Sequence, residues 1–458
     1  MDMLRGSLWD KILLFALPIA FSSICQQLFN AADVAVVGRY AGTAAMAAVG
    51  SNSALISLIV NLFVGLSVGA NVVISNYIGR GDHDRVSRAV HTSIAVALIS
   101  GVFLLVFGQV AARLLLGWMG VPEDVFELSV LYLRIYFLGM PFSMLYHFGA
   151  AVLRSKGDTR RPMLVLTASG IVNVVLNLFF VCVWGMSVDG VAIATVISQI
   201  ISGVVLMYLL TKESGMLKLS LRALRIDGGI LKDMASIGIP SGLQGCVFSL
   251  SNVCIQSAIN SLGSVTMAAC TAVLNYEMFL VYILSSFSQA CVTFTSQNFG
   301  AGNYKRCKRV FYTCWGLGAI FMCLVAGIML LFGRPLIAIF NSDPEVIEIG
   351  MIRIRTIMPF QLLNMSIDVI SGGLRGLGRS LVPTVISLVG ICGIRLIWVY
   401  TVFRVYHSLA CLVIAYPLSW TVTTAAILIA YYKVQKKVLN PDRECKWPAH
   451  NGQQPDPE

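Results

Sequence analysis

Three carboxylates stand inside long apolar stretches of the sequence: Asp33, Glu277 and Asp368. Asp33 is the only acid within residues 13–37, and that stretch contains no basic residue. A carboxylate at bilayer depth costs about 2.5–3.5 kcal/mol on insertion scales, so it normally faces a protein interior or a water-filled cavity. We therefore interpret Asp33 as an ion or proton site. The alternative is that Asp33 lies near the end of its helix and reaches the membrane interface.

Polar side chains that would complete such a site follow in later apolar stretches. Asn173 and Asn177 are four residues apart, so they lie on one face of a helix. Thr195 follows near the start of the next stretch. One carboxylate with amide and hydroxyl oxygens suits a hard cation such as sodium, or a proton held on Asp33. The alternative for the asparagines is hydrogen bonding between helices in lipid.

The other two acids lie in the second half of the chain. Glu277 has aromatic neighbours and no basic residue beside it in the sequence, so it is a candidate for attracting a cationic substrate or carrying a second proton. Asp368 is a candidate of the same kind. Arg353 and Arg355 precede it on the same apolar stretch and could pair with it, which would make its role structural.

The composition points to the membrane. Of the 458 residues, 57% are hydrophobic and 12% are charged, and the mean hydropathy is +0.80. A soluble domain carries about 25% charged residues, so we expect a protein that crosses the bilayer several times. None of the 12 cysteines has a zinc-like spacing, and no phosphate-binding loop or nucleophile motif occurs. The sequence therefore predicts no metal, no cofactor and no enzymatic activity.

Short polar loops divide the chain into twelve apolar stretches, each long enough to cross a bilayer as a helix. The predicted spans are residues 12–37, 46–77, 90–116, 126–152, 163–184, 188–210, 234–261, 266–298, 310–333, 346–373, 382–403 and 409–432. We expect a first lobe at 11–211, a cytoplasmic linker at 212–233, a second lobe at 234–432 and a disordered cytoplasmic tail at 433–458.

The basic residues predict the orientation in the membrane. The net charge is +11, and Lys and Arg gather in the loops that lie on the same side as both termini. The opposite loops hold only Arg39, Arg113, Arg334 and Arg404. Because cytoplasmic loops carry the basic excess, we predict that both termini are cytoplasmic. The charge then belongs to the inner membrane surface, and nucleic-acid binding is not expected.

The two halves of the chain repeat one another in a single register. The matched pairs are Pro18 with Pro240, Asn30 with Asn252, Gly79 with Gly300, Arg85 with Arg306, Arg134 with Arg355 and Pro162 with Pro383. An even number of spans in each copy gives both copies the same orientation. We therefore predict an all-α membrane protein of twelve transmembrane helices in two six-helix lobes, related by a pseudo-two-fold axis along the membrane normal. The repeat places Ile255 opposite Asp33, so the lobes are chemically unequal.

Several of these segments together resemble one transporter family. They are the stretch from Pro18 to Asp33, the turns at 79–81 and 300–303, the segment 190–195 and the loop 374–378. Over about residues 10–432 the chain is similar to the multidrug and toxic compound extrusion (MATE) transporters. The resemblance implies two six-helix lobes, export of organic cations in exchange for protons or sodium, and rocking between outward-open and inward-open states.

In the branch of that family with an ion site in the first lobe, the resemblance implies roles for Asp33, Asn173, Asn177 and Thr195. An acid is usual at the position of Asn177, and its loss disfavours sodium binding here.

The other branch of the family carries acids at positions that match Phe248 or Ser249, and Asn364, so its site is missing from this sequence. Glu277 matches an acid that is frequent on the eighth span of bacterial members.

We expect a monomeric antiporter of the bacterial inner membrane. Its partners would be a small organic cation and the lipid bilayer, and it would export the cation in exchange for H+ or Na+ by rocker-switch alternating access. The alternative is a flippase for a lipid-linked oligosaccharide or peptidoglycan precursor, which would need basic side chains such as Arg353 and Arg395 to hold a diphosphate. An intramembrane enzyme or sensor would need a catalytic constellation that the sequence lacks.

Overall fold

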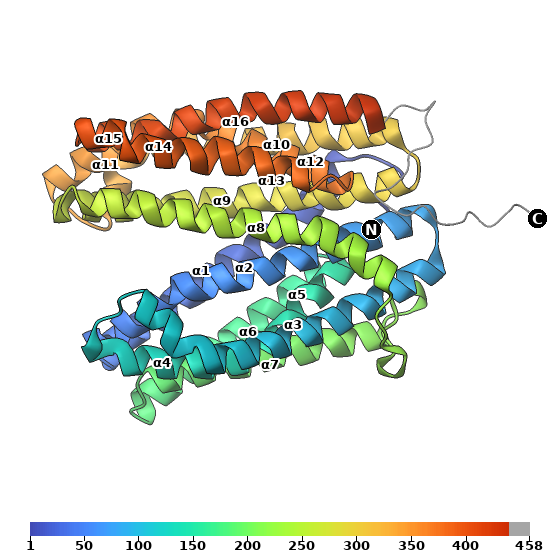
Figure 1. The fold of residues 1–458 in the computed structure, drawn as a ribbon, viewed down its shortest axis with the longest axis horizontal. Helices are drawn as coiled ribbons and strands as arrows, with labels where there is room; N and C mark the ends of the chain where they lie inside the picture. The colour runs from blue at the N-terminus through green and yellow to red at the C-terminus, as the bar shows by residue number, and fades with distance from the viewer. Residues whose placement is uncertain (439–458) are drawn as a thin grey trace, which may run out of the picture.

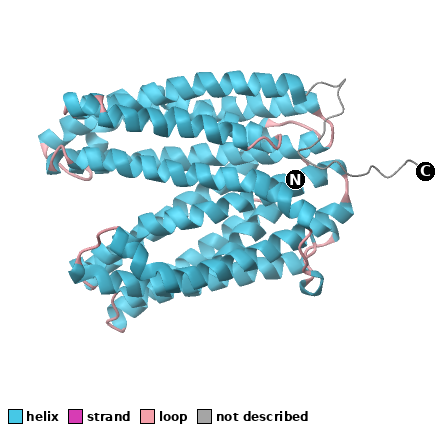
Figure 2. Ribbon diagram, in the orientation of Figure 1, coloured by secondary structure: helices cyan, strands magenta, loops and turns pink. Residues whose placement is uncertain are grey.

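The computed structural model describes residues 1–438, and within that range every regular element is helical (Figure 2). Helix α16 continues to Val438, beyond the predicted end of the last span at 432. The rest of the predicted tail, residues 439–458, lies outside the described residues.

The first half of the chain forms seven α-helices. They are α1 (Trp9–Tyr40), α2 (Thr43–Arg80), α3 (His83–Trp118), α4 (Glu123–Leu138), α5 (Met140–Ser155), α6 (Arg160–Leu178) and α7 (Val188–Lys212). A π-helix, η1 (Phe179–Val183), extends α6, and two single 3-10 turns, η2 (Gly215–Leu217) and η3 (Leu221–Ala223), follow α7. The predicted span 126–152 is broken at Gly139, where α4 and α5 meet at an angle of 49°.

The second half begins with three long helices and then becomes more broken. Its elements are α8 (Gly228–Asn260), α9 (Ser264–Gly300), α10 (Tyr304–Ala338), α11 (Pro344–Ile357), the 3-10 turn η4 (Met358–Phe360), α12 (Gln361–Gly376), α13 (Leu381–Ser387), the π-helix η5 (Leu388–Gly393), α14 (Ile394–Tyr400), α15 (Val402–Val405) and α16 (Leu409–Val438). Pro359 lies in η4, where it interrupts the predicted span 346–373. The two π-helices follow the matched positions Pro162 and Pro383.

Within the described residues, nine helices are long and apolar enough to cross a membrane, or ten if the bent pair of α4 and α5 forms one span. The predicted spans at 234–261 and 346–373 are not among them. In the structure the first of these stretches is α8, a single helix of 33 residues, and the second is the pair α11 and α12, which are only 14 and 16 residues long.

Two hydrophobic cores divide the molecule, and the first helix of each half crosses into the core of the other. Phe15 and Ile19 of α1 are buried in the core built mainly by the second half. Met234 and Ile237 of α8 are buried in the core built mainly by the first half. This exchange ties the two bundles together at the end of the molecule that carries the N-terminus, and the bundles diverge toward the opposite end, where α4 and α11 lie (Figure 1).

Glycines allow the backbones of α2 and α8 to touch at this junction. A Cβ on Gly65 would lie 2.3 Å from Gly242 N, and a Cβ on Gly69 would lie 2.2 Å from Met234 O. Toward the C-terminal end of α2, Ser296 Oγ of α9 donates to Val72 O at 2.6 Å. The two bundles are therefore held together by direct backbone approach and by buried hydrogen bonds.

Candidate functional site

Asp33 is buried inside the first bundle, with 8% of its surface exposed, although it lies seven residues before the end of α1 at Tyr40. Asn177 Nδ2, from α6, donates a hydrogen bond to Asp33 Oδ1. The alternative reading, in which this carboxylate reaches the membrane interface, does not fit its burial and its partner. The carboxylate instead faces the interior, where α1 and α6 pack against each other.

Asn173 lies one turn before Asn177 on the same face of α6. In the orientation that satisfies both ends of its amide, the nitrogen donates to Asp33 Oδ1 at 3.0 Å and the oxygen accepts from the Thr195 backbone N at 3.3 Å. The amide therefore bridges α1 and α7. The four-residue spacing of the asparagines brings both amides to one carboxylate oxygen, as the helical period requires.

Thr195 completes the cluster at its α7 side. Its hydroxyl donates to Val191 O at 2.9 Å and lies 3.4 Å from the Asn173 amide. Asn177 Oδ1 is sealed from solvent and accepts no hydrogen bond from any described residue. The four residues that the sequence singled out thus meet at one place, where a carboxylate and an unengaged amide oxygen are available to a proton or a small cation. No group of three or more His, Cys, Asp or Glu side chains suited to a metal ion occurs among residues 1–438.

Glu277 has a different environment from the one its sequence neighbours indicate. Arg353 Nε donates to Glu277 Oε1 at 3.0 Å, and Arg353 Nη2 donates to Oε2 at 2.8 Å. Arg353 is completely buried and Glu277 is 7% exposed. This two-pronged pair between α9 and α11 compensates the charge of Glu277, although no basic residue lies beside it in the sequence, and Arg353 pairs with Glu277 rather than with Asp368.

Asp368 lies on α12, apart from both of these clusters. Ser288 Oγ donates to its backbone oxygen at 2.8 Å, and no hydrogen bond to its carboxylate is found within the described part of the chain. Arg375, two turns later on the same helix, donates instead to Gln244 Oε1 at 2.6 Å. The structure therefore does not bring Asp368 to the Asp33 cluster.

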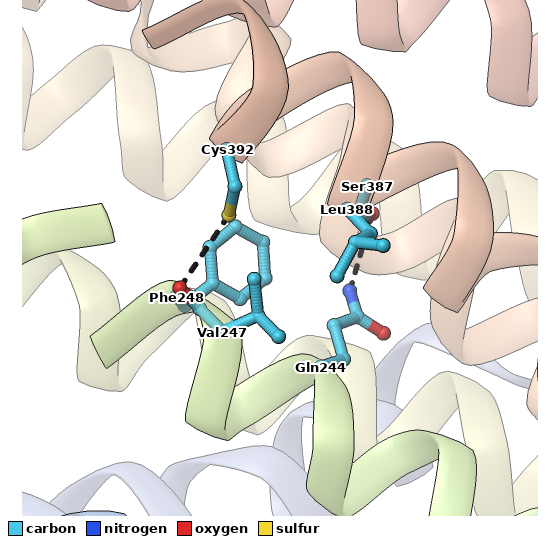
Figure 3. A pocket seen from close by; sticks show the side chains of 6 residues that line it. All are labelled: Gln244, Val247, Phe248, Ser387, Leu388 and Cys392. Carbon is cyan, nitrogen blue, oxygen red and sulfur yellow. Dashed lines mark hydrogen bonds between the residues drawn. The ribbon is translucent and has the colours of Figure 1, made fainter. Parts of the chain in front are cut away.

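A narrow pocket in the second bundle lies beside Gln244, between α8 and η5 (Figure 3). Gln244 Nε2 donates to Ser387 Oγ at 3.2 Å, and Cys392 Sγ donates to Val247 O at 3.5 Å. The residues that line it are Gln244, Val247, Phe248, Ser387, Leu388 and Cys392. Phe248, which together with Ser249 is a candidate for the position of an acid in the other branch of the family, makes this wall apolar.

The sequence suggests Arg395 only as a basic side chain for the flippase alternative, and it does not predict the buried aromatic cluster around this residue. Arg395 is 4% exposed, and it lies in an apolar stretch just as Asp33 does. Its Cζ lies 4.1 Å from the centre of the Tyr416 ring, and its Nε donates to Ser419 Oγ at 3.2 Å. The argument that singled out Asp33, a charge inside a membrane-length stretch, applies equally to this arginine.

Comparisons with known proteins agree with the internal repeat. The family model MatE matches residues 18–179 and, a second time, residues 240–401. The "Probable multidrug resistance protein YoeA" of Bacillus subtilis is 29% identical over 442 residues, which cover 94% of this chain and 95% of that protein. The "Probable multidrug resistance protein NorM" of Thermotoga maritima is 29% identical over 394 residues and covers 84% of each chain.

Solved structures share the fold. A crystal structure of MATE in complex with MaL6 superimposes with a TM-score of 0.89 over 95% of this chain and 98% of that one, at 22% identity. At this identity the likeness concerns the arrangement of the helices. The family match itself spans most of the described residues, in two copies that coincide with the two bundles. The chain therefore belongs to the MatE family, whose members are multi-pass membrane transporters and not enzymes.

Proposed function

We propose that this protein is a secondary antiporter that exports organic cations in exchange for protons, or for sodium, bound at Asp33. The observation that carries the proposal is the convergence of the Asn173 and Asn177 amides on the buried Asp33 carboxylate. The relatives named as multidrug resistance proteins support drugs as the substrate class. They do not favour the flippase alternative.

The proposed coupling follows from the charge of this cluster. An ionised Asp33 accepts hydrogen bonds from both amides, which holds α1 against α6. A proton on Asp33, which can sit on Oδ2, removes the charge and weakens both charge-assisted amide hydrogen bonds to Oδ1. Loading and unloading Asp33 would in this way shift how α1 packs in the bundle and change the affinity for the exported cation.

The proposed topology has twelve spans and places both termini in the cytoplasm of a bacterial cell, with the protein in the inner membrane. The basic residues of the loops at the end that carries the N-terminus support it. The bundles approach each other at that end and diverge at the other, so we assign this conformation to the outward-open state (Figure 1). A rocking motion that breaks the α2–α8 approach would give the inward-open state.

The driving force for efflux distinguishes a transporter that exchanges one coupling ion per cycle from one that exchanges two. Moving one charge through 100 mV is worth about 2.3 kcal/mol. Exchange of one monovalent cation for one proton cancels this contribution, so a site with the single acid Asp33 draws mainly on the pH difference. Glu277 is neutralised by Arg353, which supports one proton per cycle.

The experiment measures efflux of ethidium, a monovalent cation, from proteoliposomes that contain the full chain. We expect efflux under a pH difference alone, with and without sodium, and little under voltage alone. Strong voltage-driven efflux would contradict one-proton exchange, and a strict requirement for sodium would assign the site to sodium instead.

A further inference from the structure

Arg395 is a buried cation without an acidic partner. It lies on α14 inside the second bundle, and only 4% of its surface is exposed. Its Nε donates to Ser419 Oγ, whereas neither Nη1 nor Nη2 donates to any residue in the described range. The guanidinium stacks near the Tyr416 ring, at 4.1 Å, and lies 5.8 Å from the centre of the Trp420 ring. These rings favour a cation, but they do not accept hydrogen bonds from its Nη1 and Nη2 groups.

The neighbouring charges do not cancel this one. Arg353 lies on the same Tyr416 ring, at 5.5 Å, so one tyrosine contacts two guanidinium groups. Glu277 binds Arg353 through both carboxylate oxygens. The cluster therefore holds two cations and one anion, and one positive charge remains in an interior that penalises it.

The internal repeat shows how the two bundles differ at these places. Pro162 and Pro383 set an offset of 221 positions, so Asn173 falls on Ile394, and Arg395 is the next residue of the helix. Asp33 has Ile255 as its counterpart. The second bundle thus has no acid at the place of Asp33 and carries an arginine one residue after the place of Asn173.

We propose that the second bundle binds the carboxylate of a small organic anion at Arg395. A planar guanidinium with two unused Nη donors matches the two oxygens of one carboxylate, and Tyr416 and Trp420 offer aromatic surface for the organic part. One uncompensated cation balances one negative charge. A lipid-linked diphosphate would need more cations than this cluster leaves free, so the site differs from that of a flippase.

Binding at Arg395 does not involve Asp33 or any transport step. A failure of this proposal would leave the proposed antiport intact, and a failure of the antiport proposal would leave this binding site intact.

The test is isothermal titration calorimetry of the purified full chain in detergent with benzoate. Benzamide, which has the same shape without the charge, measures partition into the micelle. We expect saturable binding of benzoate to the wild type and none of benzamide. Equal heats for both probes, or no saturable binding of benzoate to the wild type, would overturn the proposal without any variant.

Two substitutions with opposite effects locate the site. Arg395→Gln should weaken benzoate binding about tenfold or more, because a charge-assisted hydrogen bond is lost. Glu277→Gln should strengthen benzoate binding, because it releases Arg353 next to Arg395. Arg395→Lys keeps the charge without the planar fork and should bind with intermediate affinity, which preserves the test if Arg395→Gln does not fold.

The matched control is Arg113→Gln, which removes an arginine that is 56% exposed and paired with Glu127. It should bind benzoate like the wild type. A folded Arg395→Gln protein that binds benzoate as tightly as Arg113→Gln does would place the anion elsewhere and overturn the proposal. So would weaker binding by a Glu277→Gln protein that is shown to be folded.

Discussion

Asn177 donates its amide hydrogen to the carboxylate of Asp33, and this bond joins two helices whose residues are far apart in the sequence. It satisfies one end of the Asn177 side chain and leaves the other, Oδ1, sealed without a partner. A buried amide oxygen without a partner is costly. The geometry thus gives Asp33 two amide donors and leaves one buried acceptor unused among the described residues.

The first prediction concerns a variant in which Asn177 is replaced by a second acid. We expect Asn177→Asp to become sodium-sensitive, because two carboxylates with the Asn173 and Thr195 oxygens suit a hard cation. Its unfolding free energy should rise by about 1 kcal/mol or more in sodium chloride relative to choline chloride at equal ionic strength, measured by thermal unfolding in detergent. The wild type and Asn177→Ala should not respond. A sodium-specific rise in the wild type would contradict the assignment to a proton.

The second prediction tests the helix junction with two glycines of α8. A Cβ on Gly242 would lie 2.4 Å from Leu62 O, whereas a Cβ on Gly245 would lie 3.6 Å from the nearest atom, in Asn61. Gly242→Ala should therefore destabilise this conformation by about 1–3 kcal/mol, since extra volume at a packed contact forces the backbones apart. Gly245→Ala, the matched control, should be neutral or mildly stabilising. Equal melting temperatures for the two variants would show that α2 and α8 do not touch here.

The third prediction concerns Glu277 and Arg353. Removal of one partner of a buried pair leaves the other charge uncompensated and costs about 3–5 kcal/mol. We expect Glu277→Gln and Arg353→Gln each to lower stability by about this amount, and the double variant to be more stable than the sum of the two losses implies. Chemical or thermal unfolding of the four proteins gives the coupling energy. Additive losses would mean that the interaction free energy between the two side chains is zero.

The fourth prediction is a pH dependence outside the membrane spans. Partial burial disfavours the charged form of Glu213, but hydrogen bonds from Lys156 and Arg161 outweigh it and hold the pKa of Glu213 below its ordinary 4.5. An acid with a lowered pKa stabilises the fold fully above its unfolded pKa, and this stabilisation is lost as the pH falls through the folded value.

Thermal unfolding of Glu213→Gln between pH 7 and pH 3.5 checks this. The variant should melt below the wild type at neutral pH, and the difference should shrink in acid. Glu127→Gln is the control, because Glu127 and its partner Arg113 have side chains that are 67% and 56% exposed and such pairs contribute little. A constant difference across this pH range would show that the Glu213 pair does not stabilise the fold.

The first-bundle site could be predicted because its residues follow simple periods. The spacing of Asn173 and Asn177 specifies a shared helix face, and Asp33 is conspicuous in an apolar stretch. The partner of Glu277 could not be predicted, because Arg353 lies 76 positions away and only the packing of α11 on α9 brings them together. A sequence neighbourhood free of basic residues says nothing about such a contact.

The prediction of the fold from the sequence has the same limit. The repeat and the apolar stretches predict an all-helical protein in two halves, whereas the exchange of Phe15 and Met234 between the two cores depends on contacts far apart in the chain. A local hydrophobic pattern does not encode the two π-helices. The bend at Gly139 does have a local signal, Pro141 at the start of α5, but the pattern of apolar residues overlooks it.

The most direct test of the central claim is uphill ethidium efflux by Asp33→Asn proteoliposomes under a pH difference, compared with the wild type and with Glu127→Gln at equal protein content. The asparagine has nearly the same shape but binds no proton in this range. We expect the wild type and Glu127→Gln to pump and Asp33→Asn to lose uphill efflux. Pumping by Asp33→Asn at the wild-type rate would contradict the claim that Asp33 carries the coupling ion.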